Sequence, residues 1–346
     1  MRVLITGNMG YVGPAVVTHL RAAHPDWILD GYDSAYFAHC LTGVAEIPER
    51  KLNRQYYGDV RSIDPKILRD YDGVVELAAI SNDPMGTHFS EVTRAVNCDA
   101  AVSIATAAAA AGVATIVFAS SCSVYGVADG ARAETDPVSP LTAYAKSKIE
   151  AEARLEALAG PSVISCLRFS TACGMSDRLR LDLVLNDFVA GALSTGRITV
   201  LSDGSPWRPL IDVADMARAI DWALTRKAEE GGRFLTVNVG ADEANYQVRD
   251  LAQAVARALP GTEVDINTAA PADSRSYRVD FGLFAKLAPD HQPRLTLADS
   301  IERLIAGLRA MGFNDPEFRR SSLMRLQMLN RHLESGRLTD SLHWAR

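Results

Sequence analysis

The stretch RVLITGNMGYVGP, residues 2–14, decides the fold. The run RVLIT predicts a strand, and it leads directly into glycines at positions 7, 10 and 13, with a helix predicted from Pro14. Glycine lets the backbone turn tightly and approach a phosphate closely, and the first amides of the helix would point at the same group. Pro14 suits a first helical turn, where no N–H is required. This strand, loop and helix therefore predict a pyrophosphate site.

A second predicted strand, WILDGYD (residues 27–33), ends in Asp33. A carboxylate at this place accepts hydrogen bonds from both hydroxyls of an adenosine ribose and repels a 2′-phosphate. The next four residues, SAYF, offer no arginine that would hold such a phosphate. The sequence therefore predicts NAD as the cofactor in preference to NADP.

Short β-rich runs alternate with helical stretches through the first half of the chain. The predicted strands are residues 2–7, 27–33, 56–60, 73–79, 115–120 and 162–169, and the predicted helices are 14–24, 91–111 and 143–159. Such alternation is typical of a parallel sheet that helices cover on both faces, and right-handed crossovers make it doubly wound. We therefore predict an α/β fold with a Rossmann-like, doubly wound parallel sheet.

The pattern loosens after about residue 174, which predicts a smaller second domain. Two later pieces, 208–224 (RPLIDVADMARAIDWAL) and 234–240 (FLTVNVG), again predict strand and helix in the main sheet. The second domain is therefore expected to be discontinuous. We predict an NAD-binding domain of residues 1–173 plus about 209–239, a substrate-binding domain of about 174–208 plus 240–312, and a helical C-terminal extension of 313–346.

The C-terminal extension is rich in arginine and predicts a helix in which Leu326, Leu329 and Leu333 share one face. This apolar stripe predicts packing against the chain's own domain or against a partner subunit. We expect a homodimer that the extension supports.

Composition excludes several classes of protein. The net charge is −6 and the pI about 5.7, which argues against binding to nucleic acid or to an anionic membrane surface. Five cysteines without a CxxC pair predict a reducing cytoplasm, and the seven histidines show no metal-binding spacing, so no metal is expected. Residues 100–118 carry no charge, but they predict an alanine-rich helix that ends at Gly112 and a following strand, not a membrane span.

Two further motifs carry chemistry. The strand end ASSCSVYG (119–126) offers Ser121 as a nucleophile, as a hydrogen-bonding group or as an ordinary strand-end residue. The segment TAYAKSK (142–148) places Tyr144 and Lys148 four residues apart on a predicted helix, hence on one face. A neighbouring ammonium and a nicotinamide cation favour the phenolate and lower the pKa of a tyrosine, which can then exchange a proton with an alcohol.

In this order and at these distances, the glycine loop, Asp33, ASSCSVYG and YAKSK resemble the extended short-chain dehydrogenase/reductase family. More narrowly they resemble its sugar-nucleotide epimerase/dehydratase branch, over roughly residues 1–310. The segments LRFSTACG (167–174) and WRPLIDVADMARAI (207–220) support the same branch.

The resemblance implies a role for each motif residue. Ser121 would hydrogen-bond the reacting sugar hydroxyl, Tyr144 would be the acid/base, and Lys148 would hold the nicotinamide ribose. The expected cofactor-binding residues are Gly7, Gly10, Tyr11, Val12, Gly13, Asp33, Asp59, Val60, Leu77, Ala78, Ala79, Tyr144 and Lys148. Of these, Asp59 and Val60 are predicted to end the third strand, near the adenine.

The substrate implied by the resemblance is a nucleotide sugar. Arg208 matches an arginine that clamps the diphosphate, Asn186 an asparagine at the same phosphates, and Arg275 a late phosphate-binding arginine. The expected substrate-binding residues are Ser81, Ser121, Thr171, Asn186, Arg208 and Arg275. Two positions depart from the family pattern, because Thr171 replaces a common asparagine and Glu76 replaces the usual histidine.

The reaction stays open among several alternatives. The family's 4,6-dehydratases carry an Asp-Glu pair after the catalytic Ser/Thr, and Cys122 and Ser123 stand there instead, which argues against water elimination. A 4-epimerase that recycles its NAD is the first interpretation, and Asp33 favours it over a 4-keto-sugar reductase or dehydrogenase with an exchangeable cofactor. A non-catalytic NAD-sensing regulator would be expected to lack Tyr144 or Lys148, and both are present.

Overall fold

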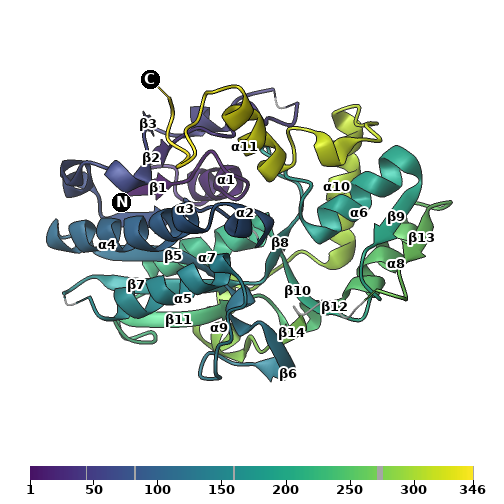
Figure 1. Cartoon of the computed structure of the whole chain (residues 1–346). Helices are drawn as coiled ribbons and strands as arrows, with labels where there is room; N and C mark the ends of the chain where they lie inside the picture. Colours follow the sequence, from purple (N-terminus) through teal and green to yellow (C-terminus); the bar gives the residue numbers. More distant parts are fainter. Residues whose placement is uncertain (44, 82, 159, 271–275, 346) are drawn as a thin grey trace.

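The computed structural model describes residues 1–43, 45–81, 83–158, 160–270 and 276–345, and its centre is a parallel sheet (Figure 1). The sheet has seven strands in the order β11-β7-β5-β4-β1-β2-β3. Their bounds are β1 (Arg2–Thr6), β2 (Ile28–Asp33), β3 (Arg54–Tyr57), β4 (Gly73–Glu76), β5 (Thr115–Ser121), β7 (Val163–Phe169) and β11 (Phe234–Val239). The order reverses between β1 and β4, as in a doubly wound sheet. The predicted Rossmann-like α/β fold is confirmed.

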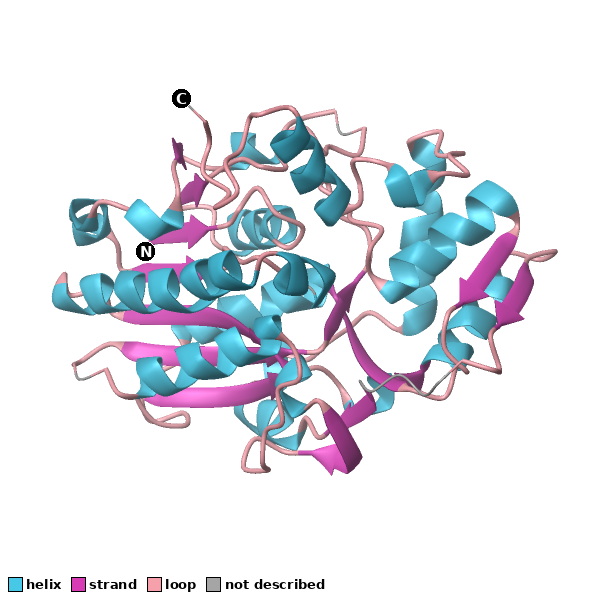
Figure 2. Cartoon of the chain, viewed as in Figure 1, coloured by secondary structure: helices cyan, strands magenta, loops and turns pink. Residues whose placement is uncertain are grey.

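Helices cover both faces of this sheet, as Figure 2 shows. On one face, α1 (Gly13–Ala23) and α7 (Val213–Thr225) pack against apolar side chains of β1, including Val3 and Ile5. On the other face, α4 (Ala101–Ala110) and α5 (Ala143–Glu156) cover Leu4, Val74 and Ile116. Because the side chains of each strand alternate between faces, both faces need apolar residues, and the central strands are buried almost throughout.

The smaller lobe lies at the carboxyl ends of the strands, to the right in Figure 1. Its helices are α6 (Val184–Thr195), α8 (Val248–Ala258) and α10 (Leu297–Ala310). Both α6 and α8 pack against the parallel pair β9 (Arg197–Val200) and β13 (Glu263–Ile266), and α10 packs against α6 and α8. A further parallel pair, β6 (Val127–Arg132) and β14 (Ser276–Val279), lies below the main sheet in Figure 1. The division into domains at the residues given above stays a prediction.

One strand assignment was wrong. The segment expected to return to the main sheet forms β10 (Trp207–Asp212), which lies instead in a separate sheet with β8 (Thr171–Cys173) and β12 (Asn245–Gln247). The reason is that the chain continues past the end of β7 into β8, and β10 pairs with that continuation. The following helix α7 does return to the main sheet, and β11 is a strand of it as predicted.

The C-terminal extension packs on its own chain. Its helix α11 (Arg325–Glu334) carries the predicted apolar stripe, and Leu329 is fully buried in an apolar core that also contains Leu338 and Leu342 of the extension, with Leu326 and Leu333 packed against that core. The stripe is therefore accounted for within one chain and no longer supports a homodimer, which stays a prediction.

In the described part of the chain, no helix combines the length and the apolarity that crossing a membrane requires. The uncharged residues 100–118 divide into α4 and β5, as predicted. All five cysteines are free thiols and are buried.

Candidate active site

A pocket of about 1040 Å³ lies where the carboxyl ends of β1, β2, β4 and β5 face the smaller lobe. Ligands of doubly wound sheets bind at this place, because the loops at the carboxyl ends diverge where the strand order reverses. The volume is at the upper end of what small-molecule pockets offer, so it has room for a dinucleotide and a second ligand. Both the glycine loop and the Ser121–Tyr144 region line this one pocket.

The glycine loop fits a pyrophosphate. Gly7 has a positive φ of +74°, and a Cβ there would lie 2.4 Å from the backbone nitrogen of Ala78. The expected residues Gly7, Gly10, Tyr11 and Val12 all line the pocket. Gly13 does not line it, and a Cβ there would lie 2.1 Å from the carbonyl oxygen of Asn8, so this glycine lets α1 begin close beneath the loop.

Asp33 closes the end of β2, as predicted, and lines the pocket. One carboxylate oxygen accepts a hydrogen bond from the amide of Met9 (3.0 Å) and the other from the amide of Ala35 (2.7 Å). Burial raises the pKa of Asp33, and these two amides oppose the change. The carboxylate thus ties the glycine loop to β2 and remains on the wall where a ribose would lie.

Replacing Asp33 by Asn is expected to weaken NAD binding about tenfold and to narrow the preference for NAD over NADP by a similar factor. The amide keeps the shape but loses the charge that strengthens hydrogen bonds to ribose hydroxyls and repels a 2′-phosphate. Calorimetric titration of the purified variant with each dinucleotide measures both effects. The exposed Asp70→Asn is the matched control, and an unchanged NAD-to-NADP ratio in Asp33→Asn would contradict the cofactor assignment.

At the far end of the cofactor side, Asp59 and Val60 line the pocket, but they do not end a strand. β3 stops at Tyr57, and Asp59 instead caps the short turn Val60–Ser62 by accepting a hydrogen bond from the Arg61 amide (2.8 Å). Its carboxylate also pairs with the Arg61 guanidinium (2.5 Å). Leu77, Ala78 and Ala79, the other expected cofactor residues, follow β4 and also line the pocket.

The C-terminal extension holds the loop at this end of the pocket. The indole nitrogen of Trp344 donates to the Ser34 carbonyl (2.6 Å), and the carbonyl of Leu342 accepts from Arg61 (3.1 Å) and from the Tyr36 hydroxyl. Ser34 and Tyr36 both line the pocket beside Asp33. Residues 324–327, at the start of α11, contribute to the wall themselves.

Deleting residues 337–346 is therefore expected to raise the rate at which NAD dissociates about tenfold, because several hydrogen bonds that order the Ser34–Phe37 loop are lost. The dissociation rate is measured by trapping released NAD with an excess of a coupled dehydrogenase. Arg320→Ala, at a side chain that is 81% exposed on the same extension, serves as the control. An unchanged rate in a folded deletion variant would show that the extension is not needed for cofactor retention.

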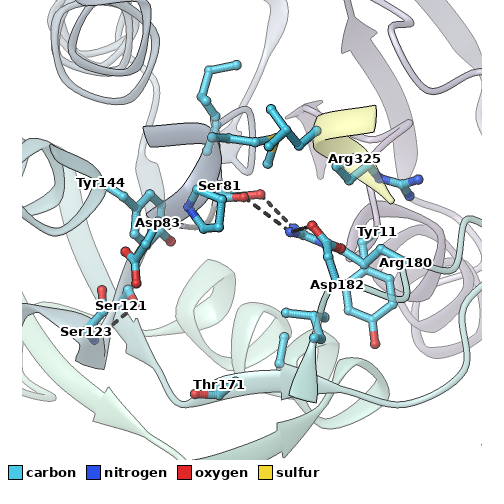
Figure 3. A pocket seen from close by; sticks show the side chains of 18 of the residues that line it. Tyr11, Ser81, Asp83, Ser121, Ser123, Tyr144, Thr171, Arg180, Asp182 and Arg325 are labelled. Carbon is cyan, nitrogen blue, oxygen red and sulfur yellow. Dashed lines mark hydrogen bonds and ion pairs between the residues drawn. The ribbon is translucent and has the colours of Figure 1, made fainter. Parts of the chain in front are cut away.

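The expected catalytic residues Ser121, Tyr144 and Lys148 line the other end of the pocket, and Figure 3 shows Ser121 and Tyr144 there. Ser121 is the last residue of β5, and its hydroxyl hydrogen-bonds Tyr144 and accepts from the Ser123 amide (3.2 Å). Tyr144 and Lys148 lie on α5, which Thr142 caps by accepting from the Ala145 amide. The Lys148 ammonium lies 5.7 Å from the centre of the Tyr144 ring and donates to the Ala119 carbonyl (2.7 Å).

Burial dominates the electrostatics of this group. Burial raises the pKa of Tyr144 to about 12, although the Ser121 hydrogen bond and the Arg180 charge both lower it. Burial also lowers the pKa of Lys148 to about 8. The cost of burying a phenolate thus outweighs the positive charge of Arg180, and the expected lowering of the Tyr144 pKa, which also invoked the nicotinamide cation, stays a prediction.

The neighbours of Ser121 have structural roles. The Ser120 hydroxyl donates to Glu152 (2.5 Å), whose carboxylate forms a buried ion pair with Arg168 (2.7 Å). Cys122 is fully buried, and its thiol donates to the Arg168 carbonyl (3.0 Å) instead of lining the pocket. Burial raises the pKa of that thiol.

The expected substrate residues divide into two groups. Ser81, Thr171 and Arg208 line the pocket, together with Ser121. Asn186 does not line it, because the side chain is buried in α6. Its amide is committed to the Gly174 nitrogen (3.1 Å), the Tyr11 hydroxyl (3.0 Å) and the Arg180 carbonyl (2.9 Å). The Asn186 side chain thus supports Tyr11 and does not reach the pocket. The expected contact between Asn186 and the phosphates of the substrate is therefore not available in this structure. Arg275 lies outside the described residues.

The pocket also contains residues that the sequence did not single out. Arg180 donates to the Ser81 hydroxyl (2.8 Å) and pairs with Asp182 (2.7 Å), at the centre of Figure 3. Asp83 lines the same wall and raises the pKa of Tyr144. The run RLRLD (178–182) was the available signal for Arg180, since alternating arginines within an apolar stretch are costly unless they are paired.

Among the described residues, one group could offer several metal ligands, namely Cys98, Asp99 and Glu150. Its carboxylates already pair with Arg94 and Arg154 at the protein surface. The group is not among the residues that line the pocket.

Comparison with known proteins identifies the family of this chain. The sequence model of the NAD dependent epimerase/dehydratase family matches residues 3–240. A UDP-glucose 4-epimerase of Streptomyces lividans is 28% identical over 281 residues (73% of this chain, 80% of that protein), and a dTDP-glucose 4,6-dehydratase of Streptomyces griseus is 26% identical over 309 residues (88% and 92%). The structure of MoeE5 in complex with UDP-glucuronic acid and NAD superposes with a TM-score of 0.76 at 26% identity, covering 90% of this chain and 99% of that one. The chain therefore belongs to the NAD-dependent epimerase/dehydratase family, whose cofactor is NAD.

Proposed function

We propose that this protein is a nucleotide-sugar 4-epimerase that retains its NAD through the reaction cycle. The observation that carries this proposal is the convergence of Ser121, Tyr144 and Lys148 on one pocket with the glycine loop and Asp33. When bound, NAD supplies a hydride acceptor that can later return the hydride. The pocket has room for a nucleotide sugar beside it.

In this proposal the side chains of the protein transfer a proton and orient the sugar hydroxyl. The ionised Tyr144 oxygen takes the proton of the sugar C4 hydroxyl while the C4 hydride leaves, and a 4-keto sugar results. Ser121 hydrogen-bonds the same sugar oxygen and holds it beside Tyr144. The keto sugar then rotates in the pocket and presents its opposite face. Hydride returns to that face of C4 and Tyr144 gives its proton back, so atoms and charge balance over one cycle.

The buried ammonium of Lys148 is proposed to hold the nicotinamide ribose and to favour the ionised form of Tyr144. Its place on α5, one turn after Tyr144, supports this role, and the bond to the Ala119 carbonyl fixes its position. Arg208, which lines the pocket at 6.0 Å from the Tyr277 ring, is proposed to bind the diphosphate of the substrate.

The two residues after Ser121 argue against a reaction that eliminates water. Cys122 is buried away from the pocket and Ser123 offers only a hydroxyl, so neither supplies the acid and base that removal of a C6 hydroxyl requires. The family itself includes dehydratases, and the Streptomyces griseus relative is named as one. The exclusion of this reaction therefore rests on these two positions.

The main alternative is a 4-keto-sugar reductase or dehydrogenase. Such an enzyme would use Ser121, Tyr144 and Lys148 for a single hydride transfer and would then exchange its cofactor. A non-catalytic NAD sensor is disfavoured because Tyr144 and Lys148 lie together beside Ser121. The fate of the C4 hydrogen distinguishes the epimerase from the reductase or dehydrogenase.

The test uses the protein purified without added cofactor. The protein is denatured, and the released nucleotide is identified and quantified by mass spectrometry. A second sample is incubated with UDP-glucose or UDP-glucuronic acid that carries deuterium at C4. Near-stoichiometric NAD and a 4-epimer that keeps its deuterium support the epimerase. An empty protein whose turnover requires added NAD(P)⁺ and moves the deuterium from C4 to the reduced cofactor would overturn it in favour of the oxidoreductase.

A further inference from the structure

Glu76 is a buried acid with no evident structural reason. It is the last residue of β4, its side chain is 3% exposed, and neither carboxylate oxygen has a hydrogen-bond partner among the described residues. The small space beside it is almost entirely apolar. That space is lined by Thr6, Val60, Ala78, Val96, Ala101 and Ile104.

An acid at such a place is costly to the folded protein, because burial without a partner removes the water that solvates the carboxylate. A buried polar group without a partner is rare in folded proteins and calls for an explanation. Packing therefore does not explain the glutamate at this position.

Lys148 lies on the same side of the sheet. β4 and β5 are parallel neighbours, and Glu76 stands directly opposite Phe118, so both side chains point to one face. The Lys148 ammonium lies 4.5 Å from the centre of the Phe118 ring and donates to the carbonyl of the next residue, Ala119. Glu76 and Lys148 thus approach Phe118 from two elements, β4 and α5.

In the described chain, few charged groups act on Glu76 and Lys148. Among the described residues, Lys148 is the charged group that acts on Glu76. Within the part of the chain that the structure describes, four titratable groups act on Lys148. They are Glu76 on β4, Glu152 on the same helix as Lys148, Cys166 on β7 and Cys98 in the π-helical turn Ala95–Ala100. Glu152 is already paired with Arg168, and burial holds the pKa of both thiols above their ordinary value. Glu76 is therefore the acid left to balance Lys148.

We propose that Glu76 is a positioning residue that acts through Lys148, keeping its ammonium charged as the pH rises above neutrality. The inference rests on the proposed role of Lys148 beside Tyr144. Burial raises the pKa of Glu76 well above its usual value, so the carboxyl is protonated at low pH and contributes no charge there. As the pH rises, Glu76 releases its proton, and its carboxylate then opposes the loss of the Lys148 proton.

The test is Glu76→Gln, which keeps the shape and removes the acid, with Glu76→His, the residue usual in the family, as a second variant. The Tyr144 phenolate is titrated by ultraviolet difference absorbance in the NAD-loaded protein without substrate, against Tyr144→Phe in the same background. We expect both variants to raise the apparent pKa of Tyr144 by about one unit, because Lys148 loses its charge at a lower pH. Thr6→Val, at a neighbour in the same space, changes packing without charge and should not move the titration.

A Tyr144 titration that is unchanged in both variants would overturn the proposal. Because no substrate is present, that outcome is distinct from a failure of the epimerase assignment, which concerns the C4 hydrogen. If the variants shift the titration and the protein still turns over no nucleotide sugar, the proposed function fails and the Glu76–Lys148 coupling stands.

A second readout reports the buried acid directly. The pKa of Glu76 is higher in the folded protein than in the unfolded chain, so stability is lost as the pH rises towards the folded pKa. Glu76→Gln removes this loss. We expect the urea midpoint of the variant to rise relative to that of the natural protein as the pH rises above the ordinary carboxyl pKa of 4.5. A difference between the two proteins that does not change with pH would show that burial does not raise the pKa of Glu76.

Discussion

Replacing Tyr144 by Phe is expected to lower turnover about 10³-fold while NAD remains bound. The substitution removes one oxygen, and with it the group that exchanges a proton with the sugar hydroxyl. It leaves the ring in place, and the Lys148 bond to the Ala119 carbonyl does not involve the phenol. Cofactor binding, at the glycine loop and Asp33, should therefore be retained.

The measurement pairs steady-state turnover of the best nucleotide sugar with quantification of NAD in the denatured protein. Tyr57→Phe, at a side chain that is 70% exposed at the end of β3, is the matched control and should leave both values unchanged. Turnover within tenfold of the natural protein would contradict the role of Tyr144 as acid/base. Full loss of NAD would instead indicate that the phenol supports the cofactor site.

Replacing Gly7 by Ala is expected to abolish NAD binding and to cost more stability than any exposed glycine substitution in this chain. The residue has a positive φ of +74°, which costs about 1–2 kcal/mol for an L-residue with a Cβ. The new Cβ would also lie 2.4 Å from the nitrogen of Ala78 and 2.7 Å from the carbonyl carbon of Leu77. Because both contacts are to backbone, either β1 or the Leu77–Ala78 segment must move, and we expect a total cost of about 3–4 kcal/mol.

Gly112→Ala separates the two causes, since Gly112 has a φ of +85° and its Cβ would have no contact within 4 Å beyond its neighbours in the chain. That control should show the backbone cost alone, about 1–2 kcal/mol, and should bind NAD normally. Urea unfolding and calorimetric titration with NAD measure both variants. If Gly7→Ala matched Gly112→Ala in stability and in NAD affinity, the close approach of the glycine loop to Ala78 would be needed neither for stability nor for NAD binding.

The cofactor half of the site could be predicted because it is built from local patterns. A strand followed by three spaced glycines and a helix specifies its own conformation within a dozen residues, and Asp33 is placed by the end of the next strand. Tyr144 and Lys148 share a helix face for the same reason. The fold class and the family are confirmed, whereas the individual roles of the site residues stay predictions.

The substrate half depends on which segments meet across the fold. An apolar run such as 208–212 has the same pattern in either sheet, so the pairing of β10 with β8 could not be inferred from it. Asn186 matched a family position, but its amide is used by Tyr11 and Arg180, residues that other segments of the chain supply. The burial of Glu76 beside Lys148 likewise arises only when β4, β5 and α5 come together.

By itself the sequence determined the α/β class, the glycine loop, the preference for NAD and the Ser121, Tyr144 and Lys148 set, because each depends on residues close in the chain or on one element's periodicity. Only the tertiary structure decided the pKa directions, the second sheet, the pocket arginine Arg180 and the place of the C-terminal extension over the Ser34–Phe37 loop. The physical reason is that burial and long-range pairing set these features. Both depend on the packing of the whole chain, which no local pattern contains.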